Sequence, residues 1–144
     1  MGIIWARTQT VGYGYQGVVE GGRRMTYYAH SVFKYNTDVE KYETSLIPGT
    51  YINPNGNVDQ SKSEKEIMSQ CFKLIDMCED LVFSSVDGVI GKGVADEITY
   101  AFMREKPIYY IHGNKLNRIK NIVIKPIENS RTRRIYATFD YEVV

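Results

Sequence analysis

The sequence contains few cysteines and few histidines, and both shortages narrow the choice of protein class. Two cysteines in 144 residues are too few for a disulfide-stabilised scaffold. Cys71 and Cys78 lie two helical turns apart, about 10.5 Å, which exceeds the roughly 7 Å that a disulfide spans. We interpret them as small core residues of an intracellular protein. No His or Cys pair has the spacing of metal ligands, so we expect neither a metal nor a cofactor.

The chain also lacks a strong net charge and a long apolar run. Its 18 basic and 17 acidic residues give a net charge of +1, which favours neither a nucleic-acid nor a membrane partner. No stretch approaches the ~20 apolar residues of a membrane-spanning helix. The amino end does not show the charged start and apolar run of a signal peptide, so we expect a cytoplasmic protein.

What the sequence does contain is the pattern of one globular α/β domain, with 43% hydrophobic residues to form its core. The stretch DLVFSSVDGVIGKGVADEITYAFMREKPIYYIH (80–112) has an apolar run, a glycine-rich turn, a helical segment and a second apolar run. Two apolar runs separated by about ten to fifteen helical residues indicate a parallel βαβ unit.

Two further strands and two helices are predicted before this unit. Strands are expected at 25–31 and 50–53, and helices at 37–47 and 61–78, each opened by a Ser or Thr followed three residues later by Glu. In the shorter helix, the residues expected to face the core are Val39, Tyr42, Leu46 and Ile47, with Glu43 in the same stripe.

The two ends of the chain depart from this alternation. After residue 112 we predict a helical turn at 115–119 and strands at 121–127 and 135–143, the last one antiparallel or at an edge. Residues 1–24 do not continue the pattern and form either a small hairpin or an appendage. The predicted organisation is therefore an N-terminal extension of residues 1–24 followed by an α/β domain of residues 25–144.

Alternating strands and helices predict a flavodoxin-like (Rossmann-like), doubly wound, mostly parallel five-stranded sheet with an extra C-terminal edge strand. In the strand order 2-1-3-4-5, ligands bind in the crevice at the carboxyl ends of strands 1 and 3. The residues that this fold would bring to the crevice are Tyr28, His30, Ser31, Ser84, Ser85, Asp87, Gly88, Gly91, Lys92, Gly93 and Glu97.

Glu97 is the most informative of these residues. Val94, Ile98, Ala101 and Phe102 form the buried stripe of the predicted helix, and Glu97 lies at its edge. A carboxylate that faces a sheet is unfavourable unless a partner or a reaction uses it. A hydrogen bond to a neighbouring loop and a catalytic role explain its position equally well.

Three sequence motifs together resemble the nucleoside 2-deoxyribosyltransferase-like superfamily over roughly residues 25–112. They are MTYYAHS at 25–31, INP at 52–54 and the block D-G…G-x-G-x-x-x-E-I…A…K-P-I-Y-Y-I at 87–111. The resemblance implies that Glu97 is the nucleophile, that Asp87 helps to protonate the base and that Tyr28 contacts the sugar or the nucleophile. The chain departs from the pattern in the longer spacing between the glycines and Glu97, and in Lys92.

A second resemblance leads to the same reaction class. The spacing Gly91-x-Gly93-x-x-x-Glu97 is similar to the G-x-G-T-x-x-E loop of lysine-decarboxylase-like phosphoribohydrolases, with Val94 in place of the Thr. Both groups cleave N-glycosidic bonds. This reaction develops positive charge on the sugar, which a carboxylate can meet, while a second acid protonates the departing base.

These patterns predict a nucleoside or nucleotide N-glycosidase or deoxyribosyltransferase. A 5′-phosphate would find hydrogen-bond donors at the start of the helix near Gly91–Gly93, at Ser84 and Ser85, and at Lys92. The resemblance further implies a homo-oligomer. The alternatives are a non-catalytic nucleotide-binding domain and an interaction domain, in which His30 and Tyr28 are structural and Asp87 is an ordinary turn residue.

Overall fold

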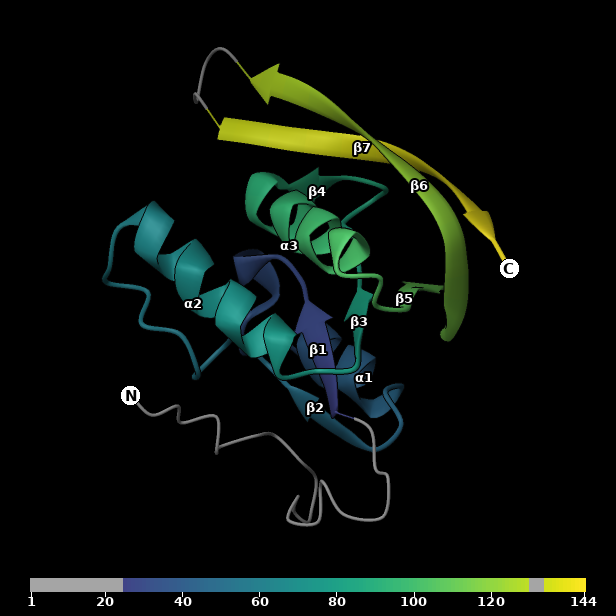
Figure 1. Ribbon diagram of the computed structural model, residues 1–144, viewed down its shortest axis with the longest axis horizontal. Coiled ribbons are helices and arrows are strands. Elements are labelled where there is room, and N and C mark those ends of the chain that lie inside the picture. The colour runs from purple at the N-terminus through teal and green to yellow at the C-terminus, as the bar shows by residue number, and fades with distance from the viewer. Residues whose placement is uncertain (1–24, 130–133) are drawn as a thin grey trace.

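The computed structural model describes residues 25–129 and 134–144, which form an α/β fold around one mixed sheet (Figure 1). The predicted extension or hairpin at residues 1–24 lies outside the described residues. The elements are β1 (Met25–Ala29), a 3₁₀ turn (Val32–Lys34), α1 (Asp38–Ser45), β2 (Thr50–Ile52), α2 (Glu64–Asp76), β3 (Asp80–Phe83), β4 (Ile90–Gly91), α3 (Lys92–Met103), β5 (Ile108–His112), β6 (Lys115–Asn129) and β7 (Arg134–Val143).

The first half of the sheet matches the predicted α/β class. β2, β1, β3 and β5 lie side by side in this order and run parallel. This arrangement is the 2-1-3-4 part of the predicted strand order. It places the carboxyl ends of β1 and β3 next to each other, because Ala29 pairs with Phe83.

The second half of the sheet differs from the five-stranded, flavodoxin-like prediction, which was wrong here. Gly113 and Asn114 both have positive φ, as a two-residue hairpin turn requires, and His112 pairs with Lys115 across it. Residues 115–119 therefore begin the antiparallel strand β6, and not a helical turn. The full order is β2-β1-β3-β5-β6-β7-β4, so β7 is antiparallel as predicted but is covered at its far side by β4.

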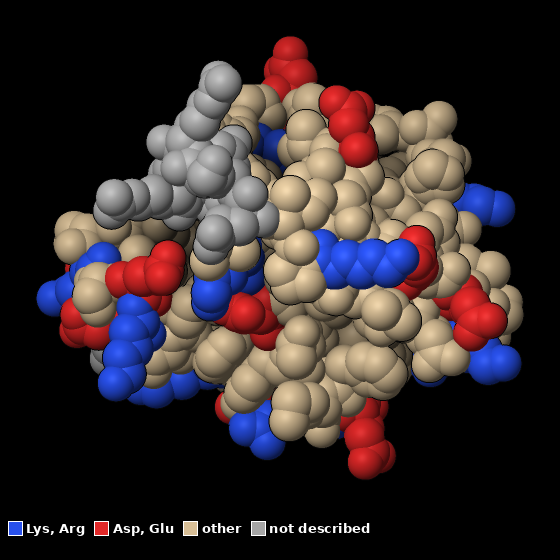
Figure 2. All heavy atoms as spheres, turned by 90° about the horizontal axis from the view of Figure 1, so that it is seen from above, with Lys and Arg blue, Asp and Glu red and all other residues tan. Residues whose placement is uncertain are grey.

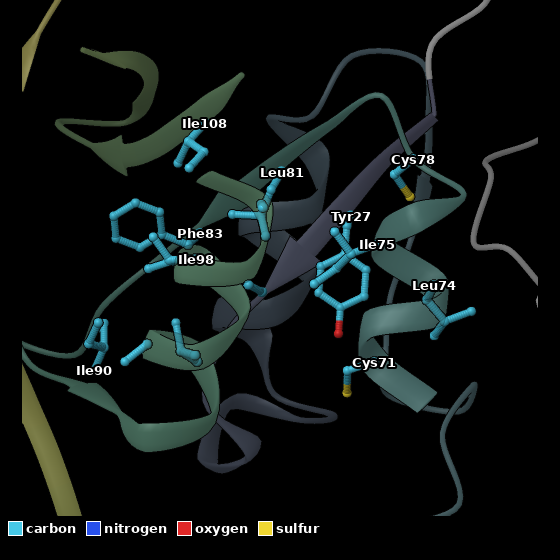
Figure 3. Close-up of a cluster of buried hydrophobic side chains, with 14 of the residues drawn as sticks. Tyr27, Cys71, Leu74, Ile75, Cys78, Leu81, Phe83, Ile90, Ile98 and Ile108 are labelled. Carbon is cyan, nitrogen blue, oxygen red and sulfur yellow. The ribbon is translucent and has the colours of Figure 1, made fainter. Parts of the chain in front are cut away.

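The helices cover the two faces of the parallel strands unequally. α2 and α3 lie on one face, and α1 lies on the other (Figure 1). Successive side chains of a strand point to opposite faces, so Tyr27 joins the large cluster under α2 and α3 (Figure 3), whereas Tyr28 and Val82 face α1. β6 and β7 form a long curved ribbon beside α3.

The shorter helix is oriented only partly as predicted. Glu43 and Ile47 are buried as expected, and Glu40 is buried too, whereas Val39 and Tyr42 are 49% and 46% exposed. The helix turns its acids inward because buried polar partners compensate them, as described below. Thr37 caps α1 by accepting a hydrogen bond from the Glu40 backbone, and the capping box of α2 is formed by Ser63 and Glu66, two residues later than predicted.

The described surface shows mixed charge. On the face drawn in Figure 2, acidic and basic side chains alternate among uncharged ones without a large patch of one sign. None of the helices within residues 25–129 and 134–144 is long and apolar enough to cross a membrane.

Candidate functional site

The polar residues at the carboxyl ends of β1 and β3 fall into two clusters, one on each face of the sheet. The strand alternation causes this division, because Tyr27 and Phe83 point toward α2 and α3, whereas Tyr28 and Ser84 point toward α1. We call the first group the Glu97 cluster (Tyr27, Cys71, Glu97) and the second the Glu43 cluster (Tyr28, Lys34, Glu43, Ser84).

The Glu97 cluster is built where α3 crosses β1. Val94, Ile98 and Ala101 of α3 are buried as predicted, and Glu97 is only 5% exposed beside them. Phe102, the fourth residue of the predicted stripe, is instead 43% exposed, so that part of the prediction was wrong. The Tyr27 hydroxyl donates a hydrogen bond of 2.6 Å to Glu97 Oε2. The Cys71 thiol of α2 lies near both groups and contributes to the pKa shift of each.

The electrostatic setting of Glu97 is unusual for a carboxylate. Burial raises the pKa of Glu97 to about 7, although the hydrogen bonds from Tyr27 and Cys71 act in the opposite direction. Among the described residues, no Lys, Arg or His forms an ion pair with Glu97. The pKa of Tyr35 is raised by burial and, in addition, by the nearby charge of Glu97. The carboxyl group is thus buried with neutral donors only.

The Glu43 cluster is a compensated network on the other face. Lys34 Nζ lies 2.8 Å from Glu43 Oε2, and both side chains are nearly buried. Ser84 and Tyr28 each donate a hydrogen bond to Glu43 Oε1, at 2.7 and 2.5 Å. Lys34 also donates to Ser84 Oγ and to the Ser85 carbonyl, both at 2.9 Å. Every polar atom of this network has a partner, and it ties the 3₁₀ turn and α1 to the end of β3.

His30 belongs to the same face. Its ring stacks on Tyr28 with a centroid distance of 3.8 Å, and its Nε2 lies 2.8 Å from Glu40 Oε2. Glu40 also accepts hydrogen bonds from the side-chain amides of Asn53 and Asn55. Burial lowers the pKa of His30, and the hydrogen bond to Glu40 opposes this shift. His30 therefore acts as a structural histidine that links β1 to α1.

Asp87, the predicted acid, lies away from these clusters. Val86 and Val89 exchange two backbone hydrogen bonds, and Asp87 and Gly88 form the exposed turn between them, both with positive φ. This turn chemistry is that of a hairpin. The structure does not bring the Asp87 carboxyl group into contact with Glu97.

The remaining predicted residues have local roles. Ser31 caps the 3₁₀ turn by accepting a hydrogen bond from Phe33, and the Ser85 hydroxyl bonds Tyr110 at 2.8 Å. Lys92 lies on the surface and pairs with Asp96 at 2.7 Å. Gly91 is the N-cap of α3 and gives it no side-chain hydrogen bond, and Gly93 lies in the first helical turn, where an added Cβ would meet Met68.

The aromatic residue of β1 that contacts Glu97 is Tyr27, not Tyr28 as predicted. A shift of one residue along a strand reverses the face, and the sequence shows two tyrosines in a row without marking which one points toward α3. Cys71 and Lys34 were also missed as site residues. Only Cys71 left a signal, because it was predicted as a core residue and lies within the helix predicted at 61–78.

Comparisons of the chain with protein-family models, with curated proteins and with solved structures found no match. The family resemblance remains a prediction from the sequence motifs. Among residues 25–129 and 134–144, no group of three or more His, Cys, Asp or Glu side chains could hold a metal ion. Two surface hollows of about 450 and 480 Å³ lie elsewhere, along α3 and β6 and along the α1 face of the sheet, and Glu97 lines neither.

Proposed function

We propose that this protein cleaves or transfers the N-glycosidic bond of a nucleoside or nucleoside 5′-monophosphate, with Glu97 as the nucleophile. One observation carries the proposal: Glu97, in the second turn of α3, is a buried carboxyl group bonded to Tyr27 of β1, and no described cation pairs with it. Doubly wound sheets bind ligands at the carboxyl ends of their strands, and α3 begins on that side of the sheet. A buried carboxylate without a counter-charge is unfavourable in the resting protein. A sugar that becomes cationic beside it supplies the missing charge only in the transition state.

The proposed reaction has two steps. The Glu97 carboxylate attacks the anomeric carbon, the bond from that carbon to the base nitrogen breaks, and its electron pair and one proton go to the base. The sugar is then held as an ester of Glu97. Water or a second base attacks the same carbon, which releases Glu97 and gives hydrolysis or transfer, respectively.

Tyr27 positions the nucleophile in this scheme. Its hydroxyl holds Oε2 at 2.6 Å and favours the ionised carboxylate. Because burial raises the pKa of Glu97 to about 7, the rate should increase with pH and level off above about pH 7. A 5′-phosphate would meet the open N-terminus of α3, whereas Ser84 is already engaged by Glu43 and Lys34.

The position of Asp87 favours a second candidate, a nucleotide-binding domain without turnover. Asp87 is exposed in a turn, so it is not placed as the predicted proton donor for the base. In the first candidate, solvent must supply this proton. The two candidates differ in one measurable outcome, which is whether bound nucleoside or nucleotide loses its base.

The experiment is incubation of the full chain with a panel of nucleosides and 5′-monophosphates, followed by chromatographic detection of released base. We expect release by the wild type and a loss of about a thousandfold or more in Glu97→Gln, because the amide cannot form the ester. Glu105→Gln is the matched control, since Glu105 is exposed just beyond α3. Unchanged release by Glu97→Gln would remove Glu97 as the nucleophile. Binding without release by the wild type would favour the second candidate.

A further inference from the structure

The strand β7 is paired along the whole of one edge but only along part of the other. β6 pairs with it from Arg134 to Val143, whereas β4 pairs only with Tyr136 and Ala137 on the opposite edge. Figure 1 shows the short β4 beside the first part of β7, which continues past it. No other strand within residues 25–129 and 134–144 pairs with this edge over residues 138–143, a length of about 20 Å.

The backbone of this open edge can accept a further strand. Val144 donates its N–H to the Arg118 carbonyl of β6. Because the N–H and C=O groups of successive strand residues point to opposite sides, those of Phe139, Tyr141 and Val143 point away from β6. These backbone groups have no hydrogen-bond partner among the described residues. A row of open N–H and C=O groups is a template for pairing with another chain.

One face of the open edge is apolar. Phe139, Tyr141 and Val143 alternate along β7, so their side chains share one face. Phe139 packs against the main core, and the rings of Phe139 and Tyr141 stand edge-on to Tyr110, at centroid distances of 5.2 and 5.1 Å. Tyr141 and Val143 remain 36% and 53% exposed. A strand added at this edge would cover them with its own apolar side chains.

The other face of the open edge is acidic. Asp140 and Glu142 alternate with the apolar residues and are exposed. Lys125 pairs with Asp140 at 2.5 Å, whereas Glu142 accepts a hydrogen bond from the Asn121 amide and pairs with no described cation. Opposite charges on neighbouring strands stabilise their pairing, so the acids favour a strand with basic residues on this face.

A second copy of β7 does not meet this requirement. The residues that carry the open backbone groups must lie opposite one another in an antiparallel pair. Placing Tyr141 opposite Phe139, Tyr141 or Val143 of a second copy puts Asp140 opposite Asp140, Asp140 opposite Glu142 or Glu142 opposite Glu142, respectively. Like charges directly opposite each other are destabilising. The acids therefore disfavour self-pairing and favour a basic partner.

We propose that residues 138–143 of β7 are a docking edge for an extended peptide segment of another protein in which basic and apolar residues alternate. The backbone of this segment pairs with Phe139, Tyr141 and Val143, and its basic side chains meet Asp140 and Glu142. The inference does not depend on the proposed function, because no residue of the Glu97 or Glu43 cluster takes part.

The first test measures the binding of fluorescein-labelled acetyl-Lys-Val-Lys-Val-Lys-Val-Lys-amide to the full chain by fluorescence anisotropy. N-methyl groups on the valines block the amides that face β7, whereas N-methyl groups on the lysines block only the outer edge of the peptide. We expect the valine-methylated peptide to bind about tenfold more weakly or worse, and the lysine-methylated peptide to bind like the parent. No binding of the parent peptide, or equal binding of the two methylated ones, would overturn the inference.

The second test reverses the charge of the edge. The double variant Asp140→Lys/Glu142→Lys should lose about tenfold or more in affinity for the lysine peptide and gain affinity for acetyl-Glu-Val-Glu-Val-Glu-Val-Glu-amide. Glu79→Lys, which reverses an exposed acid outside β7, is the matched control and should change the affinity by less than about twofold. An unchanged preference in the double variant would contradict the role of the acids. If it does not fold, Glu142→Lys alone gives the same comparison.

The third test distinguishes a peptide partner from a second copy of the chain. Val143→Pro removes one N–H from the open edge, and Val143→Ala shortens the same side chain but keeps the N–H. We expect the proline variant to bind the lysine peptide about threefold more weakly or worse than the alanine variant does. Analytical ultracentrifugation of both variants and the wild type gives the oligomeric state. A wild-type dimer that Val143→Pro dissociates and Val143→Ala does not would identify the occupant as a second copy and overturn the proposal.

Discussion

On the α1 face of the sheet, the Glu43 carboxylate is bonded by Lys34, Ser84 and Tyr28, whereas on the opposite face Glu97 is bonded by Tyr27. Both carboxyl groups are buried, and they are bonded by adjacent tyrosines of β1, Glu43 by Tyr28 and Glu97 by Tyr27. The two carboxyl groups differ in their counter-charge: Lys34 pairs with Glu43, whereas no described cation pairs with Glu97. A buried charge with a complete set of partners strengthens the fold around it, whereas one without a counter-ion is strained and available for chemistry.

The two faces should therefore respond to pH in opposite directions. The pKa of Glu97 is above its unfolded value, so its contribution to stability is present at low pH and is lost as pH rises from about 4.5 to about 7. The pKa of His30 is below its unfolded value because of burial, so its contribution is present above about pH 6.5 and is lost as pH falls. At acidic pH, Glu97 therefore no longer lowers the free energy of unfolding, whereas the contribution of His30 to it is lost.

The largest expected effect comes from breaking the compensated network. Lys34→Met leaves Glu43 buried without its cation and should lower the free energy of unfolding by about 3 kcal/mol. Urea unfolding at pH 7 measures this change. Lys65→Met, which removes an exposed lysine of α2, is the control and should change stability by less than about 0.5 kcal/mol. Adding Glu43→Gln to Lys34→Met should recover part of the loss. A loss below 1 kcal/mol in Lys34→Met would contradict the comparison.

A second prediction concerns the uncompensated carboxyl group. Removing the charge by Glu97→Gln should abolish the Glu97 part of the pH dependence of stability. From pH 4.5 to pH 8, the free energy of unfolding of the variant should rise relative to the wild type by up to about 3 kcal/mol. Chemical unfolding over this pH range tests the prediction. Parallel curves for the two proteins would mean that Glu97 titrates normally.

A smaller effect should separate the two adjacent tyrosines. Tyr27→Phe removes a donor from Glu97 and should reduce base release about tenfold or more, with its acid limb moved to higher pH. Tyr28→Phe removes a donor from Glu43 and should lower stability by about 1–2 kcal/mol with a smaller effect on release. Steady-state rates and melting curves of both variants measure the two effects. The reverse order of rate losses would restore the original prediction for Tyr28.

The smallest effect is expected at the surface ion pair of α3. Lys92→Ala should change the free energy of unfolding by less than about 0.5 kcal/mol, because solvent screens the pair with Asp96. If Lys92 contacts a 5′-phosphate, as the sequence predicts, the same variant should weaken the binding of a nucleoside 5′-monophosphate but not of the nucleoside. Calorimetric titration of both ligands distinguishes these outcomes. If Lys92→Ala binds the nucleoside 5′-monophosphate as tightly as the wild type does, Lys92 does not contact the phosphate.

The parallel half of the fold could be predicted because its signals are local. Apolar runs, the Thr37 cap of α1 and most of the 3.6-residue stripe of α3 lie within single elements, and the structure follows them between β1 and β5. The hairpin after β5 was missed because a Gly-Asn pair such as Gly113 and Asn114 can either precede a helix or form a tight turn between two strands. Only their positive φ angles, which the sequence does not specify, make them a hairpin turn.

The site was predictable in part for a related reason. The burial of Glu97 followed from the helical period, which is the same in every helix. The choice between Tyr27 and Tyr28 depends on the strand register, and the inward turn of α1 depends on Lys34, Ser84 and Tyr28, which come from three different segments. The hydrophobic periodicity of the α1 sequence does not include these distant partners. For this reason it predicted that Val39 and Tyr42 face the core.

The tight turn between β5 and β6 also affects how the chain folds. β6 pairs with β5 and β7, its neighbours in sequence, so these pairs close short loops and can form on the microsecond scale of hairpins. The pairing of β1 with β3 joins Thr26 to Asp80 across 54 residues and waits for a long loop to close. We therefore expect the carboxyl-terminal ribbon to form early, and the Glu97 cluster, which needs β1, α2 and α3 together, to form among the last contacts.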